Sequence, residues 1–150
     1  MRILFLDDAP WRHNLVGAKM EGPDSKIAGI EVVHVWTVDE AVEALTTLGP
    51  FQHIYLDHDL NDFAPMTGKE SRFAGTYGSL ELTGRDVTRW MAKNHHLFDP
   101  KPKVTVHSWN ASEAPNMVRD LWEAGFEVVW ELFNGGTDPR DADGDEPNYG

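Results

Sequence analysis

The stretch that decides the fold is residues 3–8, which read Ile-Leu-Phe-Leu-Asp-Asp. Four apolar residues followed at once by acids are typical of a short strand buried inside a parallel sheet. The pattern returns in residues 54–59, Ile-Tyr-Leu-Asp-His-Asp, and in residues 104–108, Val-Thr-Val-His-Ser. Two further apolar runs, residues 30–36 and 126–133, carry glutamates along their length. We therefore expect five strands, with these last two half exposed at the edges of the sheet.

Helical patterns fill the gaps between these strands. Thr37 and Glu40 form a capping-box pattern at the start of one predicted helix. Thr83 caps a second predicted helix, and Pro115 opens a third. Alternating strands and helices predict a single-domain, three-layer α/β fold of the flavodoxin or receiver type. The predicted sheet is parallel and five-stranded, with the flavodoxin-like order 2-1-3-4-5 and helices on both faces.

Composition limits the class of protein. The chain has 150 residues, 41% of them hydrophobic, which is enough for one domain with a buried core. It has no cysteine, no apolar run near the roughly 20 residues that cross a bilayer, and no signal-peptide pattern. These features predict a cytoplasmic protein. We expect residues 1–133 to form the domain and residues 134–150, rich in Gly, Asp and Pro, to form an acidic tail.

The charge of the chain limits its partners. The net charge is −12, from 13 basic and 25 acidic side chains. A field of that sign opposes binding to duplex DNA and to anionic membranes. It still permits a small phosphorylated ligand, since the charges around a site decide what that site binds. The sequence does not predict an oligomeric state.

Acidic side chains follow the first and third predicted strands. Asp7 and Asp8 end the first strand, and Asp57 and Asp59 end the third. In the predicted order these strands are neighbours where the strand order reverses, which is where ligands bind in such sheets. Four carboxylates in one crevice repel one another, and a divalent cation such as Mg²⁺ or Mn²⁺ relieves that repulsion. We therefore expect a metal site; the alternative is that these acids are loop and helix-cap residues.

Histidines and a serine stand at the same edge of the predicted sheet. His107 and Ser108 follow the fourth strand, and His58 stands between two candidate metal ligands. His107 can act as a general acid or base, and Ser108 can bond a phosphate oxygen. A packing role is an equal alternative for both histidines.

The segment from residue 58 to residue 83 has no strong helical or strand pattern. A segment this long inside a compact domain is functional or disordered. It contains Lys69 and Arg72, and Arg85 follows in the first turn of the next helix. We predict that Arg72 and Arg85 contact a phosphate group. The alternative, which we favour for Lys69, is pairing with the protein's own excess acids.

Taken together, these motifs resemble those of one known family. They are Asp-Asp at residues 7–8, Asp-His-Asp at 57–59, Thr-Gly-Arg-Asp at 83–86 and His-Ser-Trp-Asn at 107–110. The combination is similar to the cyclic-phosphate processing receiver-like family, which is related to response-regulator receiver domains. The resemblance covers about residues 2–122. It implies that the chain binds a divalent metal and processes cyclic phosphates on nucleotides or RNA ends.

The resemblance also implies roles for individual residues. The implied metal ligands are Asp7, Asp8, Asp57 and Asp59. The implied chemical or phosphate-binding groups are His58, His107, Ser108 and Asn110. The chain departs from the pattern in two places. The resemblance leads us to expect an arginine soon after Asp8, and here three residues precede Arg12, which either takes that place or does not. The fifth strand lacks the lysine of response-regulator receivers, which argues against ordinary phospho-acceptor signalling.

The leading hypothesis from the sequence is a metal-dependent phosphoesterase that acts on a cyclic phosphate. Asp57, His58 and His107 would carry the chemistry, and Arg72, Arg85 and Ser108 would neutralise or bond the phosphate. One alternative is a module that binds a cyclic nucleotide or phosphate without cleaving it. Another is a receiver-like signalling module with Asp57 as the phospho-acceptor.

Overall fold

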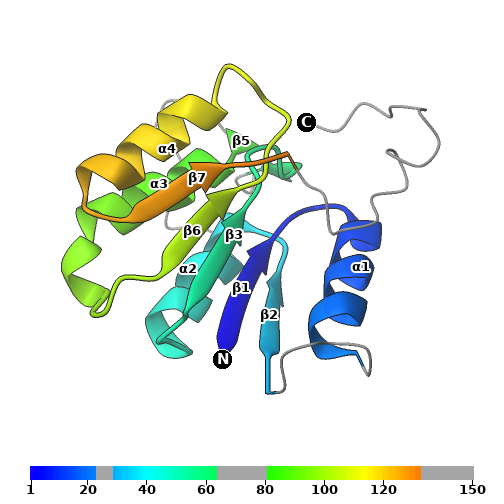
Figure 1. Ribbon diagram of the computed structural model, residues 1–150. Coiled ribbons are helices and arrows are strands. Elements are labelled where there is room, and N and C mark those ends of the chain that lie inside the picture. The colour runs from blue at the N-terminus through cyan, green and yellow to red at the C-terminus, as the bar shows by residue number, and fades with distance from the viewer. Residues whose placement is uncertain (23–28, 64–80, 133–150) are drawn as a thin grey trace, which may run out of the picture.

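The computed structural model of the protein describes residues 1–22, 29–63 and 81–132. Its centre is a parallel sheet of five strands in the order β2-β1-β3-β6-β7 (Figure 1). The strands are β1 (Arg2–Leu6), β2 (Glu31–Val35), β3 (His53–Leu56), β6 (Lys103–Val106) and β7 (Glu127–Trp130). Counted along the chain, this is the predicted order 2-1-3-4-5, and β2 and β7 are the two edge strands as predicted. The predicted fold class is confirmed.

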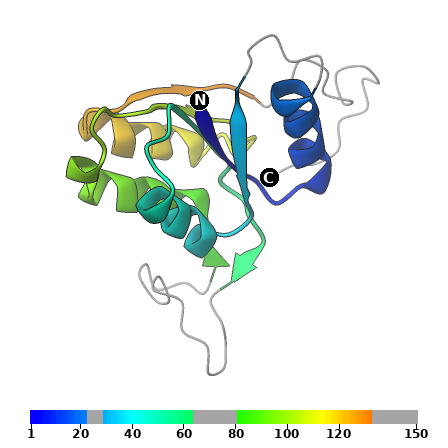
Figure 2. The same cartoon turned by 90° about the horizontal axis from the view of Figure 1, so that it is seen from below.

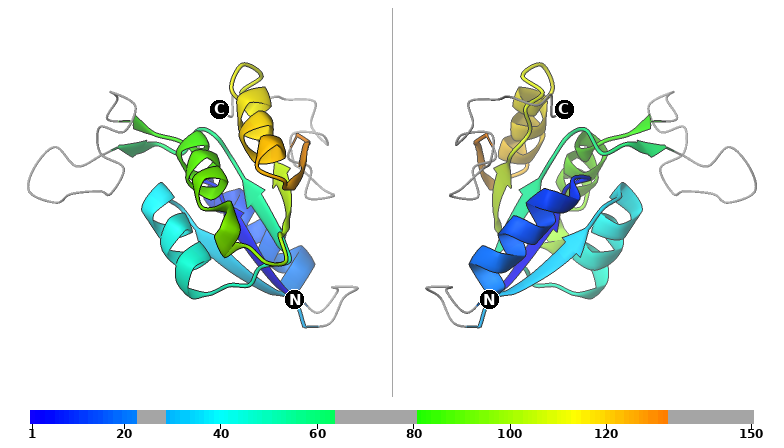
Figure 3. Two further views of the ribbon diagram at one scale, coloured as in Figure 1. Left: turned by 90° about the vertical axis from the view of Figure 1, so that its left-hand side faces the viewer. Right: turned by 90° about the vertical axis from the view of Figure 1, so that its right-hand side faces the viewer.

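Helices cover both faces of this sheet, which makes the fold three-layered (Figures 2 and 3). One face packs against α1 (Pro10–Glu21), whose Val16 contacts Phe5 of β1 and Val32 of β2. The other face packs against three helices. These are α2 (Val38–Thr47), α3 (Gly84–Lys93) and α4 (Ala114–Glu123), and a short 3₁₀ helix, η1 (His95–Leu97), follows α3.

The starts of these helices follow from the sequence. Thr37 Oγ1 accepts the N–H of Glu40 at 3.1 Å, and the Glu40 carboxylate accepts the N–H of Thr37 at 3.2 Å. This is the predicted capping box, which satisfies backbone donors that a helix start leaves without partners. Thr83 and Asp86 form a second capping box at the start of α3.

Alternating side chains of the central strands are buried on both faces. Leu4, Leu6, Ile54 and Leu56 are fully buried in the larger core, under α2, α3 and α4. Phe5 is also fully buried, in the smaller core beneath α1. A strand that is covered on both sides has no solvent face, and this explains why residues 3–6 form a continuous apolar run.

The sequence patterns missed α1 and two short strands. The buried positions of α1 are Arg12, His13 and Val16, so its buried face does not show an apolar stripe. The short strands β4 (Asp62–Phe63) and β5 (Glu81–Leu82) pair antiparallel near the two ends of the predicted long loop. Two residues are too few for an alternating pattern. Residues 64–80, with Lys69 and Arg72, and the predicted tail lie outside the described residues.

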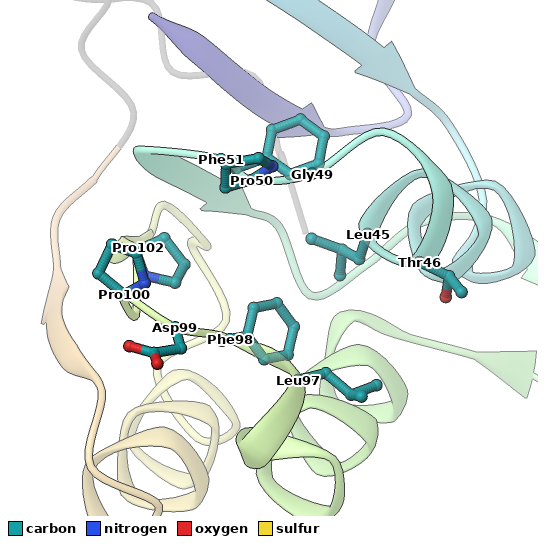
Figure 4. A pocket seen from close by; sticks show the side chains of 10 residues that line it. All are labelled: Leu45, Thr46, Gly49, Pro50, Phe51, Leu97, Phe98, Asp99, Pro100 and Pro102. Carbon is teal, nitrogen blue, oxygen red and sulfur yellow. The ribbon is translucent and has the colours of Figure 1, made fainter.

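A cavity of about 320 Å³ opens at the amino ends of β3 and β6 (Figure 4). Phe51, Phe98 and Pro102 are among the residues that line it. It therefore lies at the opposite end of the strands from the acidic residues that the sequence singles out. Among the described residues, no helix is both long enough and apolar enough to cross a membrane.

Candidate metal centre

The carboxyl ends of β1, β3 and β6 bring three titratable side chains together. Because the three strands pair in register up to their last residues, Asp7, Asp57 and His107 follow them side by side. The backbone ladder continues through them: Asp57 N–H donates to the carbonyl of Leu6 at 3.1 Å, and His107 N–H donates to that of Leu56 at 2.9 Å. One ligand atom from each side chain lies within 4.8 Å of the other two. All three side chains are buried.

Asp7 is held as an anion by its neighbours. Its Oδ1 accepts the N–H of Ala9 at 2.8 Å, and its Oδ2 lies 2.9 Å from Nε2 of His107 and 3.0 Å from Nη1 of Arg12. Burial raises the pKa of Asp7, but the hydrogen bond to His107 and the charges of His107 and Arg12 outweigh burial, so that the pKa is lowered. The His107 ring stacks on Phe5 with 5.1 Å between ring centroids, which fixes its orientation.

The two carboxylate oxygens of Asp57 have different surroundings among the described residues. Its Oδ1 accepts the N–H of His58 at 2.8 Å. Its buried Oδ2 accepts no hydrogen bond from the described residues and lies 3.6 Å from Nη1 of Arg12. Burial raises the pKa of Asp57 well above its ordinary value, and the negative charge of Asp7 raises it further.

A divalent cation fits this arrangement. It would bind Asp57 Oδ2, which accepts no hydrogen bond from the described residues, and would add positive charge beside the two carboxylates. Two carboxylates suit Mg²⁺ and Mn²⁺, and the His107 imidazole is an additional ligand type that Mn²⁺ accepts.

The other two predicted metal ligands lie outside this group of three. Asp8 Oδ2 accepts a hydrogen bond from Nδ2 of Asn61 at 2.7 Å, and burial raises the pKa of Asp8. Asp59 Oδ1 lies 2.5 Å from Nδ1 of His58. Asp7 and Asp57 thus form an inner pair, to which the structure adds His107. Successive side chains of an extended chain point in opposite directions, which separates Asp8 from Asp7.

A second polar cluster surrounds His58, next to Asp57 in the chain. His58 is largely buried, and its Nε2 lies 3.9 Å from Oε2 of Glu113 while its Nδ1 faces Asp59. Asn110 joins the cluster: its Nδ2 lies 3.3 Å from Asp59 Oδ1, and its Oδ1 accepts the N–H of Glu113 at 3.0 Å. Two carboxylates therefore flank the His58 ring. Glu113 was not predicted, because nothing in its local sequence distinguishes it from an ordinary surface acid before a helix.

The predicted phosphate-binding residues lie around these clusters. Ser108 is fully buried after β6, and its Oγ accepts the N–H of Asn110 at 3.0 Å. Arg85 Nε lies 3.3 Å from Asp120, and Arg85 Nη1 lies 3.6 Å from Glu113. Arg85 thus pairs with the protein's own acids, which was the alternative considered from the sequence. Arg72 lies outside the described residues.

The helix α1 adds two buried side chains whose importance the sequence did not establish. Arg12 is 1% exposed and lies close to both inner carboxylates. His13 Nε2 lies 2.8 Å from the carbonyl oxygen of Asp7, and His13 Nδ1 lies 2.8 Å from Nδ1 of His34. These contacts fix the start of α1 to the end of β1. In the sequence, the only sign of a role for Arg12 was its position a few residues after the acidic end of the first strand.

Gly84 allows α3 to begin directly against the end of β3. Its N–H donates to the carbonyl of His58 at 2.8 Å. A Cβ at this position would lie 1.9 Å from the backbone oxygen of Asp57. Only glycine permits so close an approach, and the contact sets the backbone position of Asp57.

Comparison with known proteins matches residues 2–123 to the family of cyclic-phosphate processing receiver domains. The chain is similar to the Mn²⁺-bound form of the response regulator Rcp1, with 19% identity and a TM-score of 0.57 over 87% of this chain and 79% of that one. It is similar to the phosphorylated cyanobacterial phytochrome response regulator RcpA, with 18% identity and a TM-score of 0.56 over the same shares. The bacteriophytochrome response regulator AtBRR is 20% identical, with a TM-score of 0.54 over 98% of this chain and 94% of that one. No curated protein sequence matches.

Proposed function

Because this chain belongs to the family of cyclic-phosphate processing receiver domains, we propose that its buried acidic centre binds a divalent cation and, over it, the phosphate group of a small ligand. The observation that carries the proposal is Asp57 Oδ2, a buried carboxylate oxygen without a hydrogen bond from the described residues, beside Asp7 and His107. The Mn²⁺-bound form of Rcp1, a protein of the same fold, supports a divalent cation in this class of domain.

The residues of the centre have separate tasks in this proposal. Asp7 and Asp57 hold the cation, and His107 and the Ala9 N–H hold the Asp7 carboxylate in place. When bound, the cation neutralises and polarises the phosphoryl oxygens of the ligand. Burial of the carboxylates strengthens their attraction for the cation, because water no longer screens it.

The ligand that fits best is a cyclic phosphate of a nucleotide or of an RNA end. The family description supports a cyclic phosphate. The net charge of −12 disfavours a long nucleic acid, which would bring many negative charges to an acidic protein. A small ligand, by contrast, brings a single phosphate group, which the bound divalent cation can neutralise.

Phosphorus NMR of a 2′,3′-cyclic nucleotide tests this function. With Mg²⁺ present, we expect the protein to shift or broaden the phosphate resonance, and EDTA to reverse the effect. Asp57→Asn should abolish the change because it removes a charged ligand of the cation. Asp99→Asn, at the opposite end of the sheet and exposed, is the matched control and should behave like the wild type. An unchanged resonance with the wild-type protein would contradict the proposal.

Hydrolysis of the cyclic phosphate is a second candidate function, which the surroundings of His58 favour. Carboxylates lie 2.5 Å and 3.9 Å from its two ring nitrogens, an arrangement that orients an imidazole for proton transfer. Water would add to phosphorus and lose a proton to His58, one ring P–O bond would break, and His58 would pass that proton to the leaving ribose oxygen. The same NMR experiment detects this as a new monoester resonance. Recovery of the cyclic nucleotide intact would leave binding without catalysis.

A further inference from the structure

The buried acidic centre already contains a cation, the guanidinium of Arg12. It comes from the start of α1, is 1% exposed, and lies next to both inner carboxylates. Its Nη1 is 3.0 Å from Oδ2 of Asp7 and 3.6 Å from Oδ2 of Asp57. The Trp11 ring lies 5.2 Å from Arg12 Cζ and gives the guanidinium an aromatic surface to rest on.

The two oxygens that face Arg12 are the ones a divalent cation needs. Asp57 Oδ2 accepts no hydrogen bond from the described residues, so its stabilisation within them depends on the charge of Arg12. Asp7 Oδ2 is shared between Arg12 and His107. A cation that binds both Oδ2 atoms therefore meets a positive charge at close range. In a buried site that repulsion is large, because little water screens it.

We propose that Arg12 is a built-in counter-cation, which a divalent cation displaces from Asp7 and Asp57 and which then binds the phosphate group of the ligand. This inference rests on the proposed function. The guanidinium fork matches the oxygens of a phosphate group. Arg12 thus weakens the binding of the metal alone and strengthens the binding of metal and phosphate together.

The proposal predicts a thermodynamic coupling between the two ligands. Phosphate gives the displaced guanidinium a new partner, so phosphate raises the affinity for the metal. By linkage, the metal raises the affinity for phosphate by the same factor. Without Arg12, the metal should bind more tightly on its own, and phosphate should lose most of its effect.

The test is Mn²⁺ binding, measured by electron paramagnetic resonance of free Mn²⁺, with and without inorganic phosphate. Arg12→Gln should bind Mn²⁺ at least about tenfold more tightly than the wild type when phosphate is absent, because a buried positive charge next to the site is gone. Phosphate should tighten Mn²⁺ binding severalfold in the wild type and much less in Arg12→Gln. Arg2→Gln is the matched control, since it removes the same charge at the opposite end of β1. It should behave like the wild type.

The outcomes separate this inference from the proposed function. Equal or weaker Mn²⁺ binding by Arg12→Gln, with a wild type that binds Mn²⁺, overturns the role of Arg12 and leaves the metal site intact. Absence of Mn²⁺ binding by both proteins overturns the proposed function and this inference with it. Binding by Arg12→Gln alone supports the inference, because Arg12 then blocks the site.

A second measurement guards against misfolding of the variant. Removing Arg12 leaves two buried carboxylates with less compensation, so Arg12→Gln should melt at a lower temperature than the wild type when metal is absent. Mn²⁺ should raise its melting temperature by more than it raises that of the wild type, because ligands that bind only the folded state stabilise it. A smaller or equal rise contradicts the proposal even if the variant is partly unfolded.

Discussion

Replacing Asp57 by Asn is expected to stabilise the metal-free protein while it removes the response to metal. Asp57 is 1% exposed, and burial is the largest cause that raises its pKa. Asparagine has nearly the same shape without the charge. Its amide can also donate to a neighbouring carboxylate such as Asp7. The variant therefore removes the free-energy cost of burying the Asp57 charge, which is the largest unfavourable contribution of the site when no metal is bound.

The magnitude follows from three opposing contributions. At an effective dielectric constant of 20, attraction to Arg12 at 3.6 Å amounts to about 4.6 kcal/mol. Repulsion from Asp7, at no more than 4.8 Å, amounts to about 3.5 kcal/mol or more. The attraction and the repulsion nearly cancel. The free-energy cost of burying the Asp57 charge therefore decides whether the substitution raises or lowers the free energy of unfolding. We expect Asp57→Asn to raise the free energy of unfolding by about 1–3 kcal/mol, the usual range for one buried polar group.

Thermal unfolding in EDTA and in Mn²⁺ measures both effects. In EDTA the melting temperature of Asp57→Asn should lie above that of the wild type by roughly 5 °C, the shift that such a change in stability gives at this chain length. In Mn²⁺ the wild type should gain stability and the variant should not. Asp99→Asn serves as the control. A variant that melts below the wild type in EDTA would show that the buried charge stabilises the fold, contrary to this expectation.

Three further predictions concern other parts of the fold. Gly84→Ala should lower the free energy of unfolding by about 2–4 kcal/mol in urea denaturation and weaken Mn²⁺ binding, because its Cβ would collide with the Asp57 carbonyl oxygen; unchanged values would contradict the close approach. Burial, and then the charge of Lys103, lower the pKa of His53 from 6.5 to about 4, so the unfolded chain binds the proton first and stability is lost as the pH falls through this interval. In His53→Gln, the loss of stability on acidification should be smaller by about 1–2 kcal/mol, a value reduced because His53 is partly exposed. An equally steep loss in the variant would show that His53 is not its cause. Thr37→Ala should cost about 1 kcal/mol in the same assay by removing the cap of α2, whereas no loss would mean that Glu40 alone suffices.

The strand order was predictable because short apolar strands with acidic ends are specific to buried parallel strands. Residues 3–8 and 54–59 show this pattern, and the structure places them next to each other in the sheet. The capping box of Thr37 and Glu40 was predictable for a similar reason: a cap is a local interaction within four residues. In both cases, the pattern that predicts the feature lies within a few consecutive residues, although the strands themselves pair over about 50 residues of sequence.

The features that the sequence did not predict depend on contacts between residues far apart in the chain. The helix α1 buries Arg12 and His13, and their partners are a strand end and a neighbouring strand, so the helix shows no apolar stripe. Glu113 is an ordinary acid until the fold brings it within 3.9 Å of His58. Of the four acids proposed as ligands, the sequence could not separate Asp7 and Asp57 from their neighbours. Strand register and side-chain direction make that distinction.

The most direct test of the central claim is an equilibrium titration of the wild-type protein with Mn²⁺, followed by electron paramagnetic resonance and repeated on Asp57→Asn. We expect the wild type to bind one Mn²⁺ ion per chain. We expect the variant to lose at least about tenfold in affinity, since a charged buried ligand has been removed. A wild type that binds no Mn²⁺ even when inorganic phosphate is present, or an Asp57→Asn variant that binds it as tightly, would contradict the claim that this buried acidic group is a metal centre.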